Sequence, residues 1–216
     1  MASPTRTRVR RGLRPETATV PEAKVGTPVS AFWTVTNWMA AVDGTLGGFL
    51  GSSRTARSTI ADGETQTSTI EVPGGSTSLD IALGGASDPS ADLDLAVCDT
   101  DDEVVGQSGG PTADESVSLG PAAGTYTVEV MDYSVPSGST AYDYHDTDFP
   151  STIASITVGG PPSVKLTTGG STTASADGTV AAAPPEGRDI FAEVRLRSAG
   201  GATVRVGGVK IENVTP

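Results

Sequence analysis

The amino-acid sequence predicts an all-β protein, in which an antiparallel, jelly-roll-like β-sandwich is followed by a smaller immunoglobulin-like β-sandwich. The first reason is composition: the 216 residues include 27 Gly and 15 Pro, so turns must be frequent and long helices rare. The second reason is the strict alternation of apolar and polar side chains within residues 91–130. A period of two is typical of strands with one buried face and one face in water.

The first 65 residues carry little periodicity. Residues 1–24 are rich in Arg, Pro and Thr and are expected to form a disordered basic tail. Residues 25–65 are expected to hold a strand, a linker or a short helix, and they contain both tryptophans, Trp33 and Trp38. These rings could pack in a core or, if exposed, stack on polysaccharide, and the sequence leaves their role open.

The first sandwich is expected over residues 66–150. Strands at 68–72 and 78–83 are joined by Pro73-Gly74-Gly75, which suits a hairpin turn. Further strands are expected near 92–97, 116–119, 125–131 and 141–144. In the strands expected at 92–97, 116–119 and 125–131, the side chains predicted to point into the core are Leu93, Leu95, Val97, Val117, Leu119, Tyr126, Val128 and Val130.

The smaller module is expected over residues 151–216, after a boundary at 147–150. Alternation restarts at Ile156 and Val158. Further strands are expected near 172–182, 190–196 and 204–211, separated by Gly-rich and Pro-rich turns. About five short strands in so short a segment suit a small immunoglobulin-like sandwich.

The order of motifs in residues 66–150 resembles a known domain. Asp-Leu-Asp-Leu at 92–95 is followed by Val-Val at 104–105, Ala-Asp-Glu-Ser-Val at 113–117 and Pro-Ala-Ala-Gly-Thr-Tyr-Thr-Val-Glu-Val at 121–130. This run is similar to the pre-peptidase C-terminal type β-sandwich, which follows the catalytic domain in secreted bacterial subtilisin-like serine proteases. Residues 151–216 resemble the small module that ends some actinobacterial members of that group.

The resemblance implies a function and a location. A domain of this type would be a non-catalytic accessory region that stabilises the protease, assists its maturation or binds its substrate. Its partners would be a protease catalytic domain or a polymeric extracellular substrate, and its location would be extracellular. Two alternatives stay open: an extracellular polysaccharide- or protein-binding module, and the remnant of a longer protease gene.

The residues of serine-protease catalysis are not recognisable in the sequence. A triad needs a His base beside a Ser nucleophile and an Asp. The chain has one histidine, His145, which lies between Tyr144 and Asp146 and is expected at the surface. Nucleophile segments, zinc-ligand spacings and phosphate-binding Gly loops are also missing. The sequence therefore predicts no catalytic and no cofactor-binding residue in this chain.

The charge distribution argues against two classes of partner. The formal net charge is −12, and all 18 acidic residues between 58 and 164 stand in a window without Lys or Arg. Such a surface repels phosphate backbones and anionic lipid headgroups, so no nucleic-acid or membrane partner is expected. There is also no run of ~20 apolar residues, and no apolar segment follows the basic N-terminus as in a signal peptide.

Asp92 and Asp94 are the candidate metal ligands. They share one strand face, and their charges repel unless a cation or hydrogen-bond donors compensate. Calcium prefers such hard oxygens, although Asp99–Glu103 fails as a calcium loop because Val104 stands where a Gly is needed. The alternative is that these carboxylates are simply solvated. The single Cys98 is expected to be an inert thiol.

The polysaccharide-binding alternative requires an exposed row of aromatic rings. The aromatic side chains in the first sandwich are Tyr126, Tyr133, Tyr142, Tyr144 and Phe149. Alternation predicts that Tyr126 points inward, so only the later four could form such a row.

Overall fold

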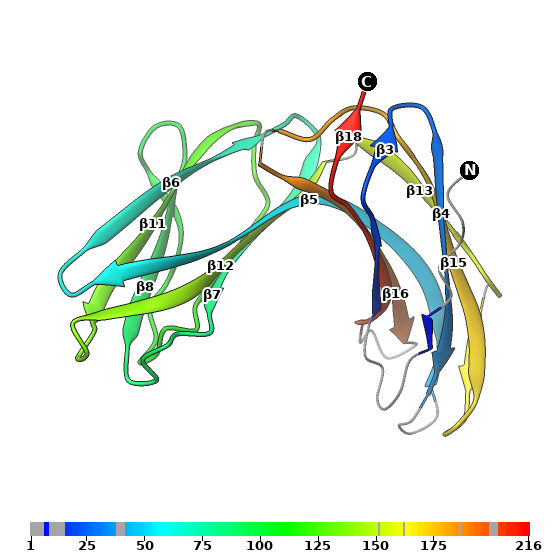
Figure 1. The fold of residues 1–216 in the computed structure, drawn as a ribbon, viewed down its shortest axis with the longest axis horizontal. Helices are drawn as coiled ribbons and strands as arrows, with labels where there is room; N and C mark the ends of the chain where they lie inside the picture. Colours follow the sequence, from blue (N-terminus) through cyan, green and yellow to red (C-terminus); the bar gives the residue numbers. More distant parts are fainter. Residues whose placement is uncertain are drawn as a thin grey trace. The chain divides into compact units, whose positions relative to one another are not determined.

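The computed structural model describes residues 7–8, 16–37, 42–150, 152–161, 163–185, 187–198 and 203–216. These residues form 18 β-strands and no helix, so the all-β prediction is confirmed (Figure 1). Among them there is accordingly no helix able to cross a membrane. The chain divides into two compact units: unit 1 combines residues 1–51 with 151–216, and unit 2 is residues 52–150.

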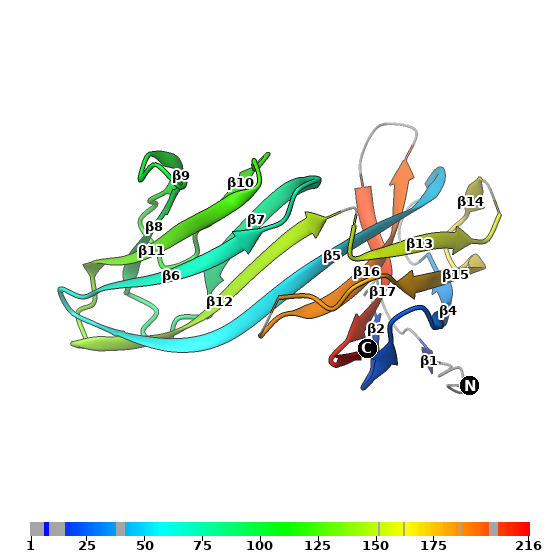
Figure 2. The same cartoon turned by 90° about the horizontal axis from the view of Figure 1, so that it is seen from above.

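Unit 2 is built from two antiparallel layers of four strands each. One layer has the order β10-β7-β12-β5 and is part of an eight-stranded sheet, to which β5 contributes residues 52–61 within this unit; the other layer is a four-stranded sheet with the order β6-β11-β8-β9 (Figure 2). The strands are β5 (Val42–Ala61), β6 (Thr65–Val72), β7 (Ser76–Gly84), β8 (Asp92–Cys98), β9 (Val104–Ser108), β10 (Ser116–Leu119), β11 (Gly124–Ser134) and β12 (Ser139–Pro150).

The core of unit 2 follows the alternation seen in the sequence. Leu93, Leu95 and Val97 of β8 are at most 1% exposed, and Val128 of β11 is fully buried opposite Val97. These side chains join Ile60, Ile70, Leu79 and Ile81 in one apolar cluster. Because the even-numbered residues of β8 face the other way, Asp92 and Asp94 stand outside this core.

Unit 1 is assembled from segments at both ends of the chain. One sheet has the order β1-β4-β15-β13, and β17 pairs with β16 and with β2 in another. The strands are β1 (Thr7–Arg8), β2 (Glu16–Val20), β3 (Ala23–Lys24), β4 (Pro28–Thr36), the start of β5, β13 (Ala154–Gly159), β14 (Val164–Leu166), β15 (Ser171–Val180), β16 (Asp189–Ser198), β17 (Thr203–Ile211) and β18 (Val214–Thr215).

The N-terminal segments differ from what the sequence led us to expect. Within the expected disordered tail, Glu16–Val20 forms β2, which pairs in parallel with Gly207–Ile211 of β17. Five residues are too few to show a period, and their partner lies at the other end of the chain. Within the uncertain 25–65 segment, β4 buries Ala31, Trp33 and Val35 on one face. The expected domain limits and the immunoglobulin-like character of residues 151–216 stay predictions.

Trp33 is a core residue of unit 1, and Trp38 lies outside the described residues. The Trp33 indole packs directly on the backbone of Gly207, since a Cβ added there would lie 2.7 Å from its Cδ2 atom. A contact this short requires a residue without a side chain.

Replacing Gly207 by Ala is therefore expected to lower the free energy of unfolding of unit 1 by ~2 kcal/mol, because the new methyl group displaces a buried indole. Both tryptophans belong to unit 1, so urea unfolding followed by tryptophan fluorescence measures this unit selectively. Gly47 is the matched control, because a Cβ added there meets no atom within 4 Å. Equal destabilisation by Gly207→Ala and Gly47→Ala would contradict this account of Trp33.

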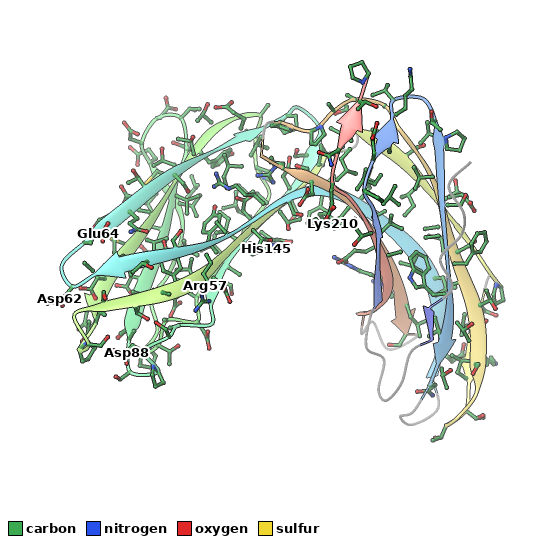
Figure 3. All side chains as sticks on the ribbon, viewed as in Figure 1. Arg57, Asp62, Glu64, Asp88, His145 and Lys210 are labelled. Carbon is green, nitrogen blue, oxygen red and sulfur yellow. The ribbon has the colours of Figure 1, made fainter. Side chains whose placement is uncertain are left out.

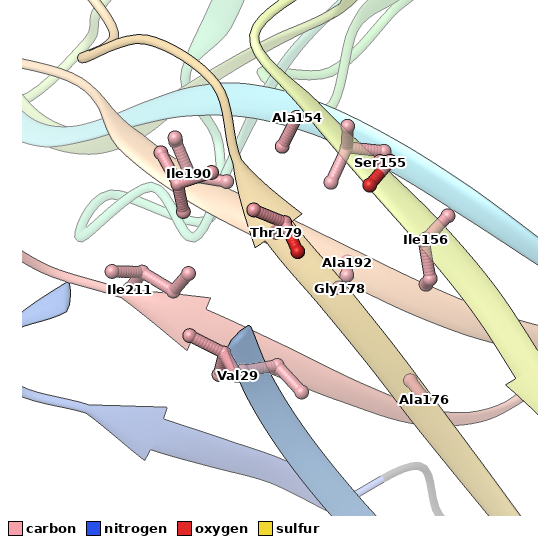
Figure 4. A pocket seen from close by; sticks show the side chains of 13 residues that line it. Val29, Ala154, Ser155, Ile156, Ala176, Gly178, Thr179, Ile190, Ala192 and Ile211 are labelled. Atoms are coloured by element: carbon pink, nitrogen blue, oxygen red, sulfur yellow. The ribbon is translucent and has the colours of Figure 1, made fainter. Parts of the chain in front are cut away.

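Unit 1 also contains a small cavity, shown in Figure 4. Its volume is about 30 Å³, and its wall is mainly apolar, with Ile156, Ile190 and Ile211 among the lining residues. That volume is roughly the share of one water molecule in the liquid. We attribute the cavity to imperfect core packing and not to a binding site.

Candidate functional site

Asp92 and Asp94 lie where the sequence predicts, side by side on the outward face of β8. They border an open hollow of about 470 Å³, together with Gly109, Gly110 and Tyr133. The Oδ1 atom of Asp92 is buried without a hydrogen-bond partner among the described residues. Burial, followed by the negative charges of Asp92 and Glu115, raises the pKa of Asp94. The structure therefore brings two mutually repelling carboxylates together.

Glu115 is the third carboxylate near this hollow, and it already has partners. It is buried and accepts hydrogen bonds from the Ser108 hydroxyl and, at 2.7 Å, from the Gly110 backbone N–H. The described residues form no group of three or more His, Cys, Asp or Glu side chains suited to a metal ion. Calcium takes about six to eight oxygen ligands. Asp92 and Asp94 would supply only part of that shell, and their role as calcium ligands stays a prediction.

Replacing Asp94 by Asn is expected to stabilise unit 2 by ~0.5 kcal/mol at neutral pH and to have no effect at pH 3. The raised folded-state pKa means that the charged form is penalised in the folded protein once the pH exceeds that pKa. At pH 3 the carboxyl is protonated in both states, so the penalty vanishes. All 4 tyrosines lie in unit 2, so urea unfolding followed by near-UV tyrosine circular dichroism reports on this unit.

The exposed turn residue Asp101 supplies the control variant, Asp101→Asn. The same measurement with added calcium chloride tests the metal prediction. If Asp92 and Asp94 bind calcium, the ion raises the unfolding midpoint of the wild-type chain and leaves that of Asp94→Asn unchanged. Equal midpoint shifts in the two proteins would remove these residues as ligands.

His145 lies on the exposed face of β12, as expected from the sequence (Figure 3). Its Nδ1 is 3.0 Å from the Thr55 hydroxyl, and its Nε2 is 2.9 Å from the Thr147 hydroxyl. On the same face, Arg57 and Asp143 form an exposed ion pair at 2.6 Å. The imidazole thus bridges two threonines of adjacent strands on the sheet surface.

The exposed aromatic row that the polysaccharide-binding alternative requires is missing at two of its four candidate positions. Tyr142 and Tyr144 are 3% and 5% exposed, because the even-numbered residues of β12 point into the sandwich. Tyr126 is buried as predicted, whereas Tyr133 is 74% exposed. The two buried rings of β12 instead line a partly open pocket that the sequence did not predict.

That feature is a cavity of about 200 Å³ between the inner faces of β5, β6 and β12, which we call the β5–β6 slot. β5 and β6 follow each other in the chain but belong to different sheets, so their neighbouring edges are not hydrogen-bonded to one another as strands. The slot is lined by Arg54, Ala56, Ser58, Gln66, Thr67, Ser68, Val130, Tyr142 and Tyr144.

Arg54 organises one end of the slot. Its Nε donates to the fully buried Asp146 at 3.1 Å, and its Nη2 lies 3.4 Å from both the Ser68 and the Tyr144 hydroxyls. The guanidinium also lies over the Tyr144 ring, 5.2 Å from the centroid. Burial, followed by the charge of Asp146, raises the pKa of Tyr144 to about 12, so its hydroxyl stays protonated at neutral pH.

Tyr142 and Gln66 organise the other end. The Tyr142 hydroxyl donates to Gln66 Oε1 at 2.9 Å, and Gln66 Nε2 donates to the Thr59 carbonyl at 2.7 Å. The sequence does contain a signal for this slot: going back from the buried Ile60 in steps of two gives Ser58, Ala56 and Arg54 at inward positions. Because these side chains are small or polar, the strand does not show the alternation of large apolar and polar residues from which inward positions were predicted.

Part of unit 2 is similar to a described family of domains. Residues 64–132, from the turn before β6 to within β11, match the bacterial pre-peptidase C-terminal domain. Over 111 residues the chain is 37% identical to pyrolysin of Pyrococcus furiosus, a match that covers 50% of this chain and 8% of the relative. The chain thus spans less than a tenth of that protein.

The solved structures with some likeness to this chain are distant from it in sequence. The pre-peptidase C-terminal domain of a Bacillus anthracis collagenase aligns with a TM-score of 0.26 and 11% identity, over 62% of this chain and 97% of that one. A periplasmic inhibitor of g-type lysozyme from Aeromonas hydrophila aligns with a TM-score of 0.34 and 15% identity, over 45% and 87% of the two chains. Scores this low carry no argument about function.

Proposed function

We propose that unit 2 is a non-catalytic accessory domain of a secreted subtilisin-like serine protease. The observation that carries the proposal is the match of residues 64–132 to the bacterial pre-peptidase C-terminal domain, which falls wholly inside the compact unit 52–150. The 37% identity to pyrolysin supports the same association. Residues 151–216 would then be the small module that ends some actinobacterial members of the group.

The non-catalytic part of the proposal rests on the single histidine. A serine-protease triad needs an imidazole hydrogen-bonded to a Ser hydroxyl on one side and to an Asp on the other. His145 is the only candidate base, and its ring nitrogens lie at hydrogen-bonding distance from Thr55 and Thr147. In this proposal, the accessory domain would act on a protease catalytic domain or on a polymeric extracellular substrate.

Attachment to a protease tests the accessory role directly. Fused behind a subtilisin-like catalytic domain, the whole chain is expected to lengthen the half-life of proteolytic activity at elevated temperature at least ~2-fold, because it slows unfolding of the attached domain. The control fusion carries Leu93→Asp, which puts a charge in the core of unit 2. Equal half-lives of the two fusions would refute the stabilising role.

Incubation of the purified chain with casein tests the non-catalytic part. No hydrolysis above buffer is expected, and His145→Ala is expected to behave identically. Hydrolysis that a serine-directed inhibitor abolishes would overturn the proposal.

A further inference from the structure

The β5–β6 slot departs from the rule that the facing inner surfaces of a β-sandwich are apolar. Ile60 of β5 and Ile70 of β6 obey the rule and are at most 1% exposed. At the inward positions that line the slot, the sequence places Arg54, Ala56 and Ser58 on β5, and Gln66 and Ser68 on β6. Large apolar side chains there would close the core, so the slot is not required by packing. Such local departures from a fold's rules are expected where a protein has a function.

We propose that the β5–β6 slot binds one ring of a neutral saccharide. Its volume of about 200 Å³ would hold roughly seven water molecules at ~30 Å³ each, which is the scale of a single sugar ring. The apolar part of the lining consists of Val130, Tyr142 and Tyr144, each at most 5% exposed, so only a small ligand that enters the slot could contact it. Hydroxyl, amide and guanidinium groups at the rim offer hydrogen bonds to its oxygens.

The charges in the wall of the slot and on the rest of unit 2 favour a ligand without net charge. Arg54 is the one ionic side chain in the wall of the slot, and its charge is balanced by Asp146 at 3.1 Å. A cation, although attracted by the net negative charge of unit 2, would meet the Arg54 guanidinium and find no carboxylate among the lining residues. An anion would meet the field of unit 2, which has 18 Asp and Glu against only Arg54 and Arg57. A hydroxyl-rich molecule without net charge avoids both costs.

The hydrogen-bonding groups of the slot are held in place before a ligand arrives. Nε of Arg54 donates to Asp146, and Nη2 lies 3.4 Å from the Ser68 and Tyr144 hydroxyls, so the guanidinium is held in one orientation in the wall of the slot. The Tyr144 hydroxyl is protonated, because its pKa is about 12, and its oxygen is fixed near Arg54. Preorganised groups lose little freedom on binding, which favours recognition of a small ligand.

Titration of the full-length chain with single sugars, followed by amide NMR spectra, tests the proposal. The neutral probes are glucose, galactose and N-acetylglucosamine, and glucuronate and glucosamine are the anionic and cationic counterparts. At least one neutral sugar is expected to shift signals of β5, β6 and β12 with a dissociation constant on the order of 1 mM. The charged counterparts are expected to bind at least ~10-fold more weakly.

Ser58→Leu is the decisive variant, because it fills the slot with an apolar side chain and leaves Arg54 and its partners intact. It is expected to weaken binding at least ~10-fold. Thr59→Leu is the matched control, since Thr59 is next in the same strand, exposed and outside the slot lining. If Ser58→Leu loses the near-UV tyrosine signal of the folded unit, Tyr144→Phe replaces it, with an expected weakening of ~3-fold or more from the lost hydroxyl.

Three results would overturn the proposal: no shift with any neutral sugar, equal binding of the charged sugars, or undiminished binding by a folded slot variant. The test is independent of the proposed accessory role, which is read from the half-life of a fused protease. Either idea can therefore fail while the other stands.

Discussion

Replacing Leu93 by Ala is expected to lower the free energy of unfolding of unit 2 by ~4 kcal/mol. Leu93 is fully buried at the centre of β8, within the apolar cluster that holds the two sheets together. Truncation removes three buried carbon atoms and leaves a cavity that rigid neighbouring strands cannot fill. Near-UV circular dichroism of tyrosine during urea unfolding isolates the effect, because unit 2 contains every tyrosine of the chain.

Val104→Ala provides the control for this experiment. Val104 lies on the adjacent strand β9 but is 57% exposed, so its loss should change stability by no more than ~0.5 kcal/mol. Tryptophan fluorescence reports unit 1 in the same samples. A loss below ~1 kcal/mol for Leu93→Ala would mean that β8 is not central to the core.

Replacing Arg54 by Leu is expected to destabilise unit 2 by ~3 kcal/mol, the second large effect. Asp146 has no exposed side-chain surface, whereas Arg54 is 31% exposed and supplies the cation that balances it. Without the guanidinium, the carboxylate keeps its desolvation penalty and loses its ion pair with Arg54. The lost stacking of Arg54 on Tyr144 adds a smaller term.

Arg57→Leu is the natural comparison, because Arg57 lies on the same strand and pairs with Asp143. Both side chains of this ion pair are more than half exposed. Because water screens such pairs, a change in the free energy of unfolding below ~1 kcal/mol is expected. The double variant Arg54→Leu/Asp146→Leu should recover most of the lost stability, since neither charge of this pair then remains. Similar losses for Arg54→Leu and Arg57→Leu would show that burial of Asp146 does not govern this pair.

The parts of the fold that the sequence could predict are those governed by local pattern. The inward positions of β8 and β11 follow from strict alternation, and the structure buries Leu93, Leu95, Val97 and Val128 accordingly. The outward pair Asp92 and Asp94 follows from the same rule, because a period of two places both on one face.

What the sequence could not show depends on partners distant in the chain. β2 is recognisable only through its parallel pairing with β17, and the burial of Trp33 depends on the bare backbone of Gly207. The β5–β6 slot was missed for a different reason. Its inward side chains are polar, so a search for apolar alternation passes over them, although their spacing from Ile60 marks the inner face.

The discontinuity of unit 1 has a consequence for biosynthesis. Its first 51 residues leave the ribosome well before residues 151–216. Strand β4 therefore cannot pair with β15, and β2 cannot pair with β17, until the end of the chain has been synthesised. The intervening residues can fold meanwhile, since the pairing partners of strands β6 to β12 all lie within residues 52–150. Ser52 pairs with Asp148, so folding of residues 52–150 brings the two ends of this segment next to each other. Co-translational folding of the middle before the periphery thus shortens the loop that the later-made strands must close.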